Sequence, residues 1–202
     1  MKIVFLGDSV TAAGRDEKDP QSLGSGYVSI ARDKLKNLYE DREFVIVNRG
    51  KKGETVADIL ARTDADAVAE NPDIAVVLCG IGDVLQKYTA GRPFVPSETE
   101  RDFGTILEKL KDCGAKVIVA EPFLFNVPDK RRMRRDFEAL SEAERRCAQK
   151  YADAFVPLDE IFAGLSESVG IAAYSEDGVH PTHRGSRRIA DSLIKKIRKF
   201  IV

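Results

Sequence analysis

The sequence predicts an α/β protein built on a parallel, doubly wound sheet. Short apolar runs alternate with segments of helical periodicity along the 202 residues, and this alternation is typical of parallel strands connected by covering helices. The apolar runs contain few polar residues, as expected for strands that are buried on both faces. Because no repeat, low-complexity segment or long linker divides the chain, we expect a single domain over residues 1–202.

Five apolar runs are predicted to be the strands. Each run is short and is bounded by glycine, proline or polar turn residues, which is the usual pattern of a buried strand. The third run is the most continuous and is typical of a central parallel strand. In chain order, the runs cover residues 1–6, 44–47, 74–79, 116–120 and 154–157.

Six helices are predicted from apolar residues that repeat at helical spacing. Thr55 is expected to cap the second helix, and Gly114 is expected to end the third. The stretch between the third strand and residue 97 contains Gly91, Pro93 and Pro96, and it is predicted to be a long loop. The helices are expected at residues 27–39, from 55 onward, 97–113, 130–151, 158–165 and 182–200.

Composition argues against several classes of protein. The formal net charge of −1 gives no indication of a nucleic-acid or anionic membrane partner. The basic run Lys130–Arg135 is the exception, and we interpret it as the solvated start of a helix, largely neutralised by the acidic residues that follow.

No apolar stretch reaches the roughly 20 residues that span a membrane, and no signal peptide is recognised. The cysteines form no disulfide framework, so we expect a cytoplasmic protein; they are Cys79, Cys113 and Cys147.

The first strand ends at Gly7-Asp8-Ser9, which places Ser9 at the carboxyl end of the sheet, where open α/β sheets bind ligands. Asp8 and Ser9 are also common helix N-cap residues, and on this stretch alone a cap is the simpler interpretation. The distant motif Asp177-x-x-His180 changes that interpretation, because a serine hydroxyl needs a base and an orienting carboxylate to become a nucleophile. We therefore predict Ser9 as the nucleophile, His180 as its base and Asp177 as the orienting carboxylate.

The choice of base is narrow, because His180 and His183 are the two histidines of the chain. Pro181 follows His180 and biases it away from helical geometry. Thr182 can then cap the last helix, which would leave His183 in its first turn. We favour His180 for these reasons.

Three loops are expected to meet at one edge of the sheet, because they follow the first three strands and each carries glycine and polar residues. Ser9, Gly50 and the pair Gly82-Asp83 can therefore converge. The oxyanion that forms during acyl transfer needs donors fixed in place. The backbone N–H groups of Ser9 and Gly50 are candidates, since glycine lets the backbone approach a ligand closely.

A metal site is the alternative of a different class. Aspartate and histidine side chains suit Zn²⁺ or Mn²⁺, and in that case a chelator would abolish activity. A nucleotide cofactor is disfavoured, because the turn after the first strand has neither a GxGxxG motif nor a P-loop lysine. We expect neither a metal nor a cofactor. The candidate metal ligands would be Asp177, His180 and His183, together with Asp8 or Asp83.

Four short motifs occur in a fixed order over nearly the whole chain. Each motif alone is weak, and the ordered set is much more specific. The motifs are Gly7-Asp8-Ser9, Asn48-x-Gly50-x-x-Gly53, Gly80-x-x-Asp83 and Asp177-x-x-His180-Pro181.

The ordered set resembles the SGNH (GDSL) hydrolase superfamily. The resemblance implies a three-layer α/β/α sandwich with a five-stranded parallel sheet, of the flavodoxin-like kind. It also implies ester hydrolysis by a Ser-Asp-His triad, here Ser9, Asp177 and His180. The oxyanion donors that it implies are the backbone N–H groups of Ser9 and Gly50.

One position departs from the family pattern. The third motif usually contains an asparagine whose side chain is a further oxyanion donor, and this chain has Gly82 there. A water molecule or the Gly82 N–H can take that place, and loss of one donor typically costs about 100- to 1,000-fold in turnover. The alternatives are a weak enzyme or a non-catalytic carbohydrate-binding protein. We expect Gly82→Asn to raise turnover if the backbone tolerates a side chain.

A closer similarity is to intracellular acetyl-xylooligosaccharide esterases of the same superfamily. It rests on Gly7–Thr11, Leu23–Val28, Asp83-Val84 with Tyr88, and Met133–Arg135. It implies removal of acetyl groups from short imported sugars, by enzymes that often form oligomers, although no stretch of this sequence indicates an interface. A broad arylesterase or lysophospholipase is the alternative within the superfamily.

The residues expected to contact substrate are a separate set. Tyr174 precedes the Asp177 motif and is placed to stack on a sugar or an acyl group, although ordinary packing is the alternative for Tyr174 and Tyr27. The full set is Asp8, Arg15, Tyr27, Asp83 and Tyr174.

Overall fold

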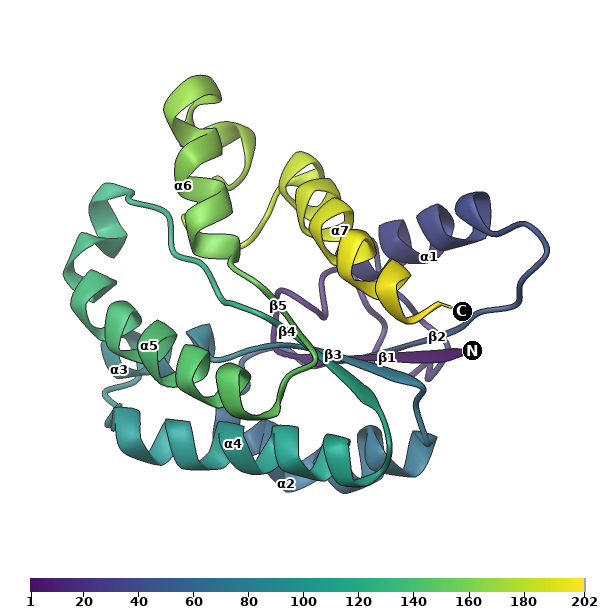
Figure 1. Cartoon of the computed structure of the whole chain (residues 1–202). Coiled ribbons are helices and arrows are strands. Elements are labelled where there is room, and N and C mark those ends of the chain that lie inside the picture. Colours follow the sequence, from purple (N-terminus) through teal and green to yellow (C-terminus); the bar gives the residue numbers. More distant parts are fainter. Residues whose placement is uncertain (202) are drawn as a thin grey trace.

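The centre of the fold is a five-stranded parallel sheet with helices on both faces (Figure 1). The computed structural model describes residues 1–201. The strand order is β2-β1-β3-β4-β5, so the three-layer, flavodoxin-like α/β/α sandwich that the sequence predicts is confirmed. The strands are β1 (Lys2–Gly7), β2 (Val45–Gly50), β3 (Ile74–Leu78), β4 (Lys116–Ala120) and β5 (Ala154–Val156).

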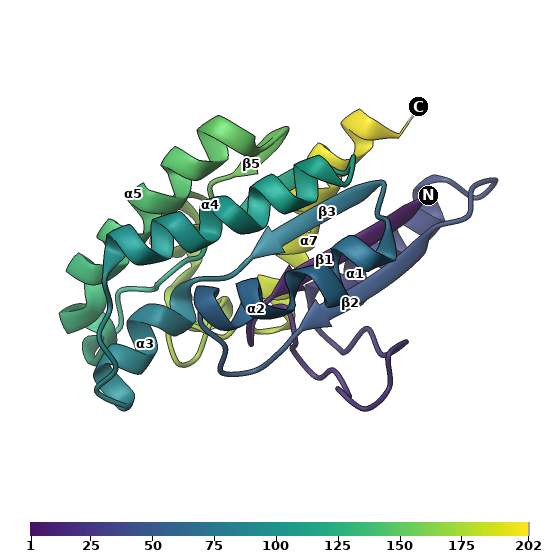
Figure 2. The same ribbon diagram turned by 90° about the horizontal axis from the view of Figure 1, so that it is seen from below.

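Seven α-helices of the described chain connect and cover the strands. Helices α1 and α7 pack together on one face, and α2 and α4 pack together on the other, with α5 beside α4 (Figures 1 and 2). The helices are α1 (Tyr27–Leu38), α2 (Val56–Asp66), α3 (Ile81–Thr89), α4 (Pro96–Asp112), α5 (Arg134–Tyr151), α6 (Leu158–Val169) and α7 (His183–Ile197). Short 3-10 turns cover residues 68–70, 128–133, 171–173 and 198–200.

Strand β1 shows why the sheet has two cores. Successive side chains of a strand point to opposite faces. Ile3 and Phe5 therefore pack under α1 and α7, whereas Val4 and Leu6 pack against α2 and α4. All four side chains are completely buried, which is why the strand reads as one apolar run.

Local signals set several helix boundaries as predicted. The Thr55 side chain accepts a hydrogen bond from the backbone of Asp58, and the Asp58 carboxylate accepts one from the backbone of Thr55, which forms a capping box at the start of α2. The Thr182 hydroxyl accepts from the backbone N–H of Gly185 at the start of α7. These caps satisfy N–H groups that lack partners within the helix.

Two boundaries differ from the sequence prediction. Helix α3 occupies residues 81–89, which were expected to form a loop. It forms because Ile81 and Val84 bury their side chains against Phe137 and Leu140 of α5. Strand β2 continues to Gly50, which pairs with Gly7 of β1, so residues 48–50, expected to begin the following loop, belong to the strand.

The carboxyl ends of β1, β2 and β3 lie at one edge of the sheet, as the parallel register requires. The segment between α6 and α7, which contains Asp177 and His180, returns to this edge before α7 begins. None of the helices in the part of the chain that the structure describes is both long enough and apolar enough to cross a bilayer.

Candidate active site

Ser9, His180 and Asp177 form a chain of hydrogen bonds at the carboxyl edge of the sheet. The Ser9 Oγ lies 3.1 Å from His180 Nε2. The other ring nitrogen of His180, Nδ1, lies 2.6 Å from Asp177 Oδ2. Residues 171 positions apart in the chain are thus brought together in the order serine, histidine, carboxylate. This arrangement can activate a hydroxyl, because the carboxylate fixes the imidazole and the imidazole can accept the hydroxyl proton.

The turn after β1 presents Ser9. The backbone carbonyl of Asp8 accepts a hydrogen bond of 2.9 Å from Ala12 N–H, which closes the turn. Asp8 Oδ1 accepts a second bond, of 3.0 Å, from the N–H of Val10. A side chain at Gly7 would overlap Leu78 and Thr11, so only glycine allows β1 to end this close to its neighbours.

The Asp177–His180 loop is held by its own hydrogen bonds. Asp177 Oδ1 accepts from the backbone N–H groups of Val179 (2.9 Å) and His180 (2.7 Å). Partial burial would raise the pKa of Asp177, but these bonds and the His180 ring outweigh it and lower the pKa to about 2. Asp177 therefore remains ionised at neutral pH and orients the imidazole.

Ser175 supports the same loop, although the sequence motifs assign it no role. Its side chain is buried, accepts from Gly178 N–H at 3.0 Å and lies 2.8 Å from the His180 carbonyl oxygen. A bridge between Ser175 and Pro181 closes the loop. A serine two residues before an aspartate is a weak local signal, and only the folded loop shows its contacts.

A cleft of about 640 Å³ opens beside Ser9. It joins residues from the turn after β1, from the β2–α2 loop, from α3 and from the His180 loop, so the predicted convergence of loops is present. Its walls are formed by Asp8, Ser9, Ala13, Lys52, Gly53, Glu54, Gly82, Leu85, Gln86, Thr89, Lys130, His180 and Pro181.

Asp8 lies at the buried end of this cleft and is 2% exposed. Its Oδ2 atom has no hydrogen-bond partner among the described residues. Burial raises the pKa of Asp8 to about 7, although the Val10 N–H and nearby His180 act in the opposite direction. A carboxyl group that titrates near neutrality therefore lies directly next to Ser9.

Gly82 lines the cleft, in the first turn of α3 rather than in a loop. A Cβ atom at this position would overlap the backbone carbonyl of Glu54. The loop before α2 thus occupies the space where a side chain would begin. The condition for Gly82→Asn to raise turnover, a backbone that tolerates a side chain at position 82, is therefore not met.

Gly50 differs from its expected role. Its N–H donates to Asn48 Oδ1 at 2.8 Å, so this donor already has a partner, and Gly50 is not part of the cleft wall. Glycine is needed at position 50 for a packing reason instead, because a Cβ atom there would overlap the backbone of Thr11 and Ala12. Gly53, three residues later, lines the cleft with φ near 74°. The sequence prediction gave Gly53 no role, and its place as the second glycine of the same motif is the signal that could have identified it.

Arg15 and Asp83 make structural contacts rather than line the cleft. Arg15 Nη1 donates to the Gly50 carbonyl at 3.0 Å. Asp83 accepts from Val56 N–H at 2.8 Å and from the Thr99 hydroxyl at 3.2 Å, which ties α3 to the starts of α2 and α4. Burial raises the pKa of Asp83 to about 6. These contacts give both residues a structural role, and their contact with substrate stays a prediction.

The two tyrosines are also in the core. Tyr27 is completely buried, and its hydroxyl lies 2.8 Å from the Thr11 hydroxyl. Tyr174 is 4% exposed and packs against Phe162, with the Arg184 guanidinium over its ring. Neither ring lines the cleft. The packing alternative therefore replaces the expected contacts with substrate.

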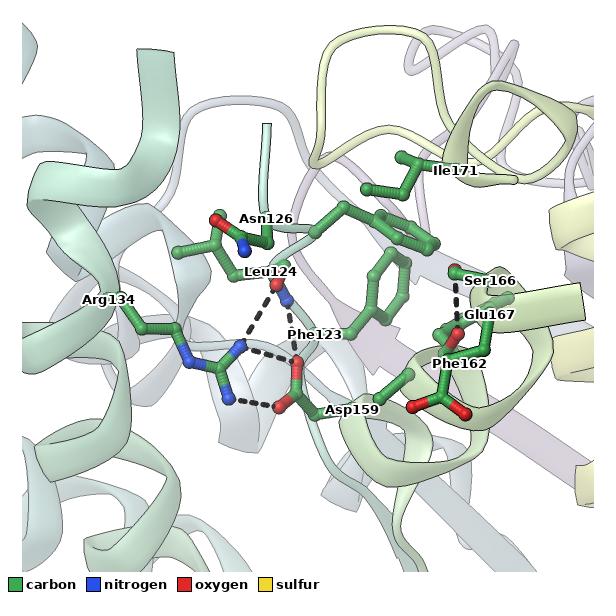
Figure 3. A pocket seen from close by; sticks show the side chains of 11 residues that line it. Phe123, Leu124, Asn126, Arg134, Asp159, Phe162, Ser166, Glu167 and Ile171 are labelled. Atoms are coloured by element: carbon green, nitrogen blue, oxygen red, sulfur yellow. Dashed lines mark hydrogen bonds and ion pairs between the residues drawn. The ribbon is translucent and has the colours of Figure 1, made fainter. Parts of the chain in front are cut away.

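A second cavity, of about 360 Å³, lies between the segment after β4 and helix α6 (Figure 3). No sequence motif indicates this cavity. The rings of Phe123, Phe125 and Phe162 form its apolar wall, and an ion pair between Arg134 and Asp159 borders it (Figure 3). The backbone N–H of Phe125 donates to the Gly178 carbonyl at 2.9 Å, so the same segment supports the His180 loop.

No cluster of metal-ligating side chains in the described residues supports the metal alternative. Within residues 1–201, no three histidine, cysteine, aspartate or glutamate side chains are grouped as they would be around a metal ion. Both ring nitrogens of His180 instead face Ser9 and Asp177.

Comparison with known proteins agrees with the fold and the motifs. The model of the GDSL-like lipase/acylhydrolase family matches residues 5–188. An acetylxylan esterase of Geobacillus stearothermophilus is 28% identical over 206 residues, which cover 97% of this chain and 93% of that protein. Esterase TesA of Pseudomonas aeruginosa is 26% identical over 200 residues, which cover 98% and 89% of the two chains.

Several solved structures superpose closely on this chain. The α/β hydrolase LAE5 from the metagenome of Lake Arreo superposes with a TM-score of 0.90 at 25% identity, covering 100% of this chain and 96% of that one. Axe2, the acetylxylan esterase of Geobacillus stearothermophilus, superposes with a TM-score of 0.89 at 27% identity, covering 97% and 93%. Two further Axe2 structures, a serine-to-alanine and a histidine-to-alanine variant, are described as catalytic mutants.

Proposed function

Because the chain belongs to the GDSL-like lipase/acylhydrolase family and is an esterase, we propose that it removes acetyl groups from small O-acetylated carbohydrates through an acyl-enzyme on Ser9. The observation that carries this proposal is the chain of hydrogen bonds from Ser9 through His180 to Asp177. The Axe2 variants described as catalytic mutants replace a serine and a histidine, which supports the same pair of roles here.

The first half of the reaction forms the acetyl-enzyme. His180 Nε2 takes the proton of the Ser9 hydroxyl while Oγ attacks the acetyl carbonyl carbon. The tetrahedral intermediate then collapses, the bond to the sugar oxygen breaks, and His180 gives its proton to the departing alcohol. Asp177, ionised throughout, stabilises the imidazolium form of His180 between these steps.

The second half returns the free enzyme. A water molecule loses a proton to His180 and attacks the acetyl carbonyl. The bond to Ser9 Oγ breaks, and His180 protonates that oxygen. Acetate leaves, and the net reaction consumes one water per ester.

Backbone N–H groups supply the oxyanion donors in this proposal. Ser9 is one, and Gly53 replaces Gly50 as the second because it lines the cleft. The third is the Gly82 N–H in the first turn of α3, where helix N–H groups lack partners within the helix. A chain with three backbone donors has no need of the asparagine side chain.

Acetyl esters of short sugars are proposed because the relatives act on such substrates by name. The comparisons include proteins called acetylxylan esterase and acetyl-xylooligosaccharide esterase. We further propose that the chain works as a single domain, since both hydrophobic cores pack on the two faces of one sheet.

The experiment compares wild type with Ser9→Ala on an aryl acetate and on acetylated xylooligosaccharides, with and without a chelator. We expect acetate release to fall by at least about 1,000-fold in Ser9→Ala and to be unchanged by the chelator. Ser168→Ala, which changes an exposed serine of α6, is the matched control. Equal rates for Ser9→Ala and wild type would contradict the mechanism, and loss of activity with the chelator would favour the metal alternative.

A second candidate is carbohydrate binding without turnover. It is favoured by one observation, the glycine at position 82 where the family usually has asparagine. It predicts that wild type and Ser9→Ala bind acetylated xylooligosaccharides with the same Kd and that neither releases acetate.

A further inference from the structure

Two lysines flank the cleft that contains Ser9. Lys52 comes from the β2–α2 loop and Lys130 from the 3-10 turn before α5, and both line the cleft together with Ser9 and His180. Among residues 1–201, no carboxylate forms an ion pair with either ammonium group. Two lysines that form no ion pair among these residues therefore line the same cleft as the proposed nucleophile.

Lys130 is fixed in place by the His180 loop. Its Cγ atom lies 3.1 Å from the point where a Cβ atom of Gly178 would be, so the aliphatic part of the lysine packs over this glycine. Gly178 has φ near 85° and sits between Asp177 and His180. The backbone N–H of Lys130 also donates to the Val127 carbonyl at 3.0 Å. Lysine stems pack on protein surface while the charged end stays in water, so this contact holds the Lys130 side chain beside the cleft that it lines.

The acidic groups of the cleft do not cancel these charges. Glu54 is paired with Arg62 at 2.6 Å, and the ionised Asp177 does not line the cleft. Asp8 is buried, with a pKa raised to about 7, and carries only part of a negative charge near neutrality. Glu17 accepts from the backbone N–H of Lys52 at 3.4 Å, so its charge weakens the field of that lysine alone.

We infer that Lys130 and Lys52 select esters whose alcohol part carries an anionic group, a carboxylate or a phosphate. The inference rests on the proposed function, because it concerns the same cleft. It narrows the substrate class to acetylated sugars with an acidic substituent. Charges at the rim of a site steer and orient an anionic ligand at long range.

The test compares aryl acetates that share a ring and differ in charge. The probes are 4-acetoxybenzoate, 4-acetoxyphenyl phosphate and the neutral 4-acetoxybenzamide, and the measured quantity is the ratio of kcat/KM for each anion to kcat/KM for the amide. Differences in leaving-group reactivity cancel when this ratio in a variant is divided by the same ratio in wild type, because the esters are the same in both. The variants are Lys130→Gln, Lys52→Gln and the double variant, with Lys36→Gln as control, because Lys36 is an exposed residue of α1 outside the cleft.

We expect each cleft variant to lower the ratio about two- to fivefold, mainly through KM, as partly exposed charges usually do. The double variant should lower it by roughly the product of the two effects, and 0.5 M salt should lower the ratio of wild type in the same direction. Lys36→Gln should keep the wild-type ratio. The anion whose ratio falls more from wild type to the double variant identifies the substituent.

Equal ratios in wild type and in the double variant would overturn the inference. If Ser9-dependent hydrolysis persisted in that case, the proposed function would still hold and only the inference about the two lysines would fail. Should wild type hydrolyse none of the acetates, the proposed function fails, and calorimetric titration with 4-hydroxybenzoate tests the lysines independently. The inference then requires a weaker Kd in the double variant, and an unchanged Kd overturns it.

Discussion

The backbone carbonyl of Glu54 lies over Gly82 and fills the space in which a side chain at that position would begin. The contact joins the loop before α2 to the first turn of α3, and both segments line the cleft beside Ser9. Replacement of the usual asparagine by glycine is therefore matched by the path of the neighbouring loop. The glycine at position 82 and the path of the Glu54 loop depend on each other. Introducing asparagine at position 82 without moving this loop is therefore not expected to add an oxyanion donor.

Gly82→Ala and Gly82→Asn are predicted to destabilise the protein by about 1–3 kcal/mol, because the new Cβ atom must displace the Glu54 backbone. Neither variant should gain turnover. Urea unfolding and kcat for an aryl acetate measure the two effects.

The matched control is Gly164→Ala, since nothing lies within 4 Å of a Cβ atom at that position of α6. A helix gains stability when an unstrained interior glycine becomes alanine, so this control should be about 0.5–1 kcal/mol more stable than wild type. A rise in turnover for Gly82→Asn, with unfolding unchanged, would show that the Glu54 loop moves aside.

Much of the fold could be predicted because its signals are local. Residues 116–120 read as a strand and form β4, and Thr55 and Thr182 cap helices as expected. Helix α3 was missed because its sequence lies between glycines and prolines. Its apolar residues, such as Ile81, gain their stability from α5, which the local pattern does not contain.

The candidate site also has a part that the sequence predicts and a part that depends on tertiary contacts. The order of motifs was enough to select Ser9, Asp177 and His180, whose side chains the fold brings together. The choice between Gly50 and Gly53 depends on a tertiary fact, because the Asn48 side chain takes the N–H of Gly50. The burial of Tyr27 and Tyr174 likewise depends on neighbours distant in sequence.

Asp177→Asn is predicted to lower kcat by about 10³- to 10⁴-fold with little change in KM. The amide cannot stabilise the imidazolium of His180, although it can keep two hydrogen bonds of the loop. The measurement is kcat for an aryl acetate, beside Glu176→Gln, which changes an adjacent exposed side chain. Similar losses in both variants would indicate a general disturbance of the loop.

Acid unfolding should also depend on Asp177. Its pKa is about 2 in the folded protein and 3.8 in the reference state, so folding favours the ionised form. The stability that this provides is present above about pH 4 and is lost as the pH falls through 2. In Asp177→Asn, thermal unfolding should lack this part of the decline between pH 4 and pH 2. Identical pH profiles for the two proteins would show that the carboxylate gains nothing from its partners.

Asp8 should have the opposite pH dependence. Its pKa is raised to about 7, so folding disfavours its ionised form, and stability decreases as the pH rises from about 4 to 7. Asp8→Asn removes this effect and can keep the acceptor for Val10 N–H. The variant should gain stability relative to wild type at pH 8, toward a limit of about 4 kcal/mol, and none at pH 4. A gain of equal size at both pH values would assign the effect to packing instead.

Asp159 is predicted to act on catalysis from a distance. Its Oδ1 accepts from Leu124 N–H at 3.0 Å, and its carboxylate pairs with Arg134, whose Nη1 donates to the Leu124 carbonyl at 3.0 Å. These bonds hold the segment after β4, and the next residue, Phe125, donates to Gly178 in the His180 loop. Asp159→Ala should therefore lower kcat about three- to tenfold while the protein remains folded at the assay temperature.

Glu138→Ala is the control for that prediction, because Glu138 pairs with the same arginine at 3.1 Å but is exposed and does not contact the segment after β4. An exposed pair of this kind contributes at most about 1 kcal/mol, and its loss should leave kcat unchanged. Circular dichroism at the assay temperature separates loss of positioning from loss of folded protein. If Asp159→Ala and Glu138→Ala had the same kcat, the segment after β4 would not position His180, and the ion pair would serve only to close the wall of the second cavity.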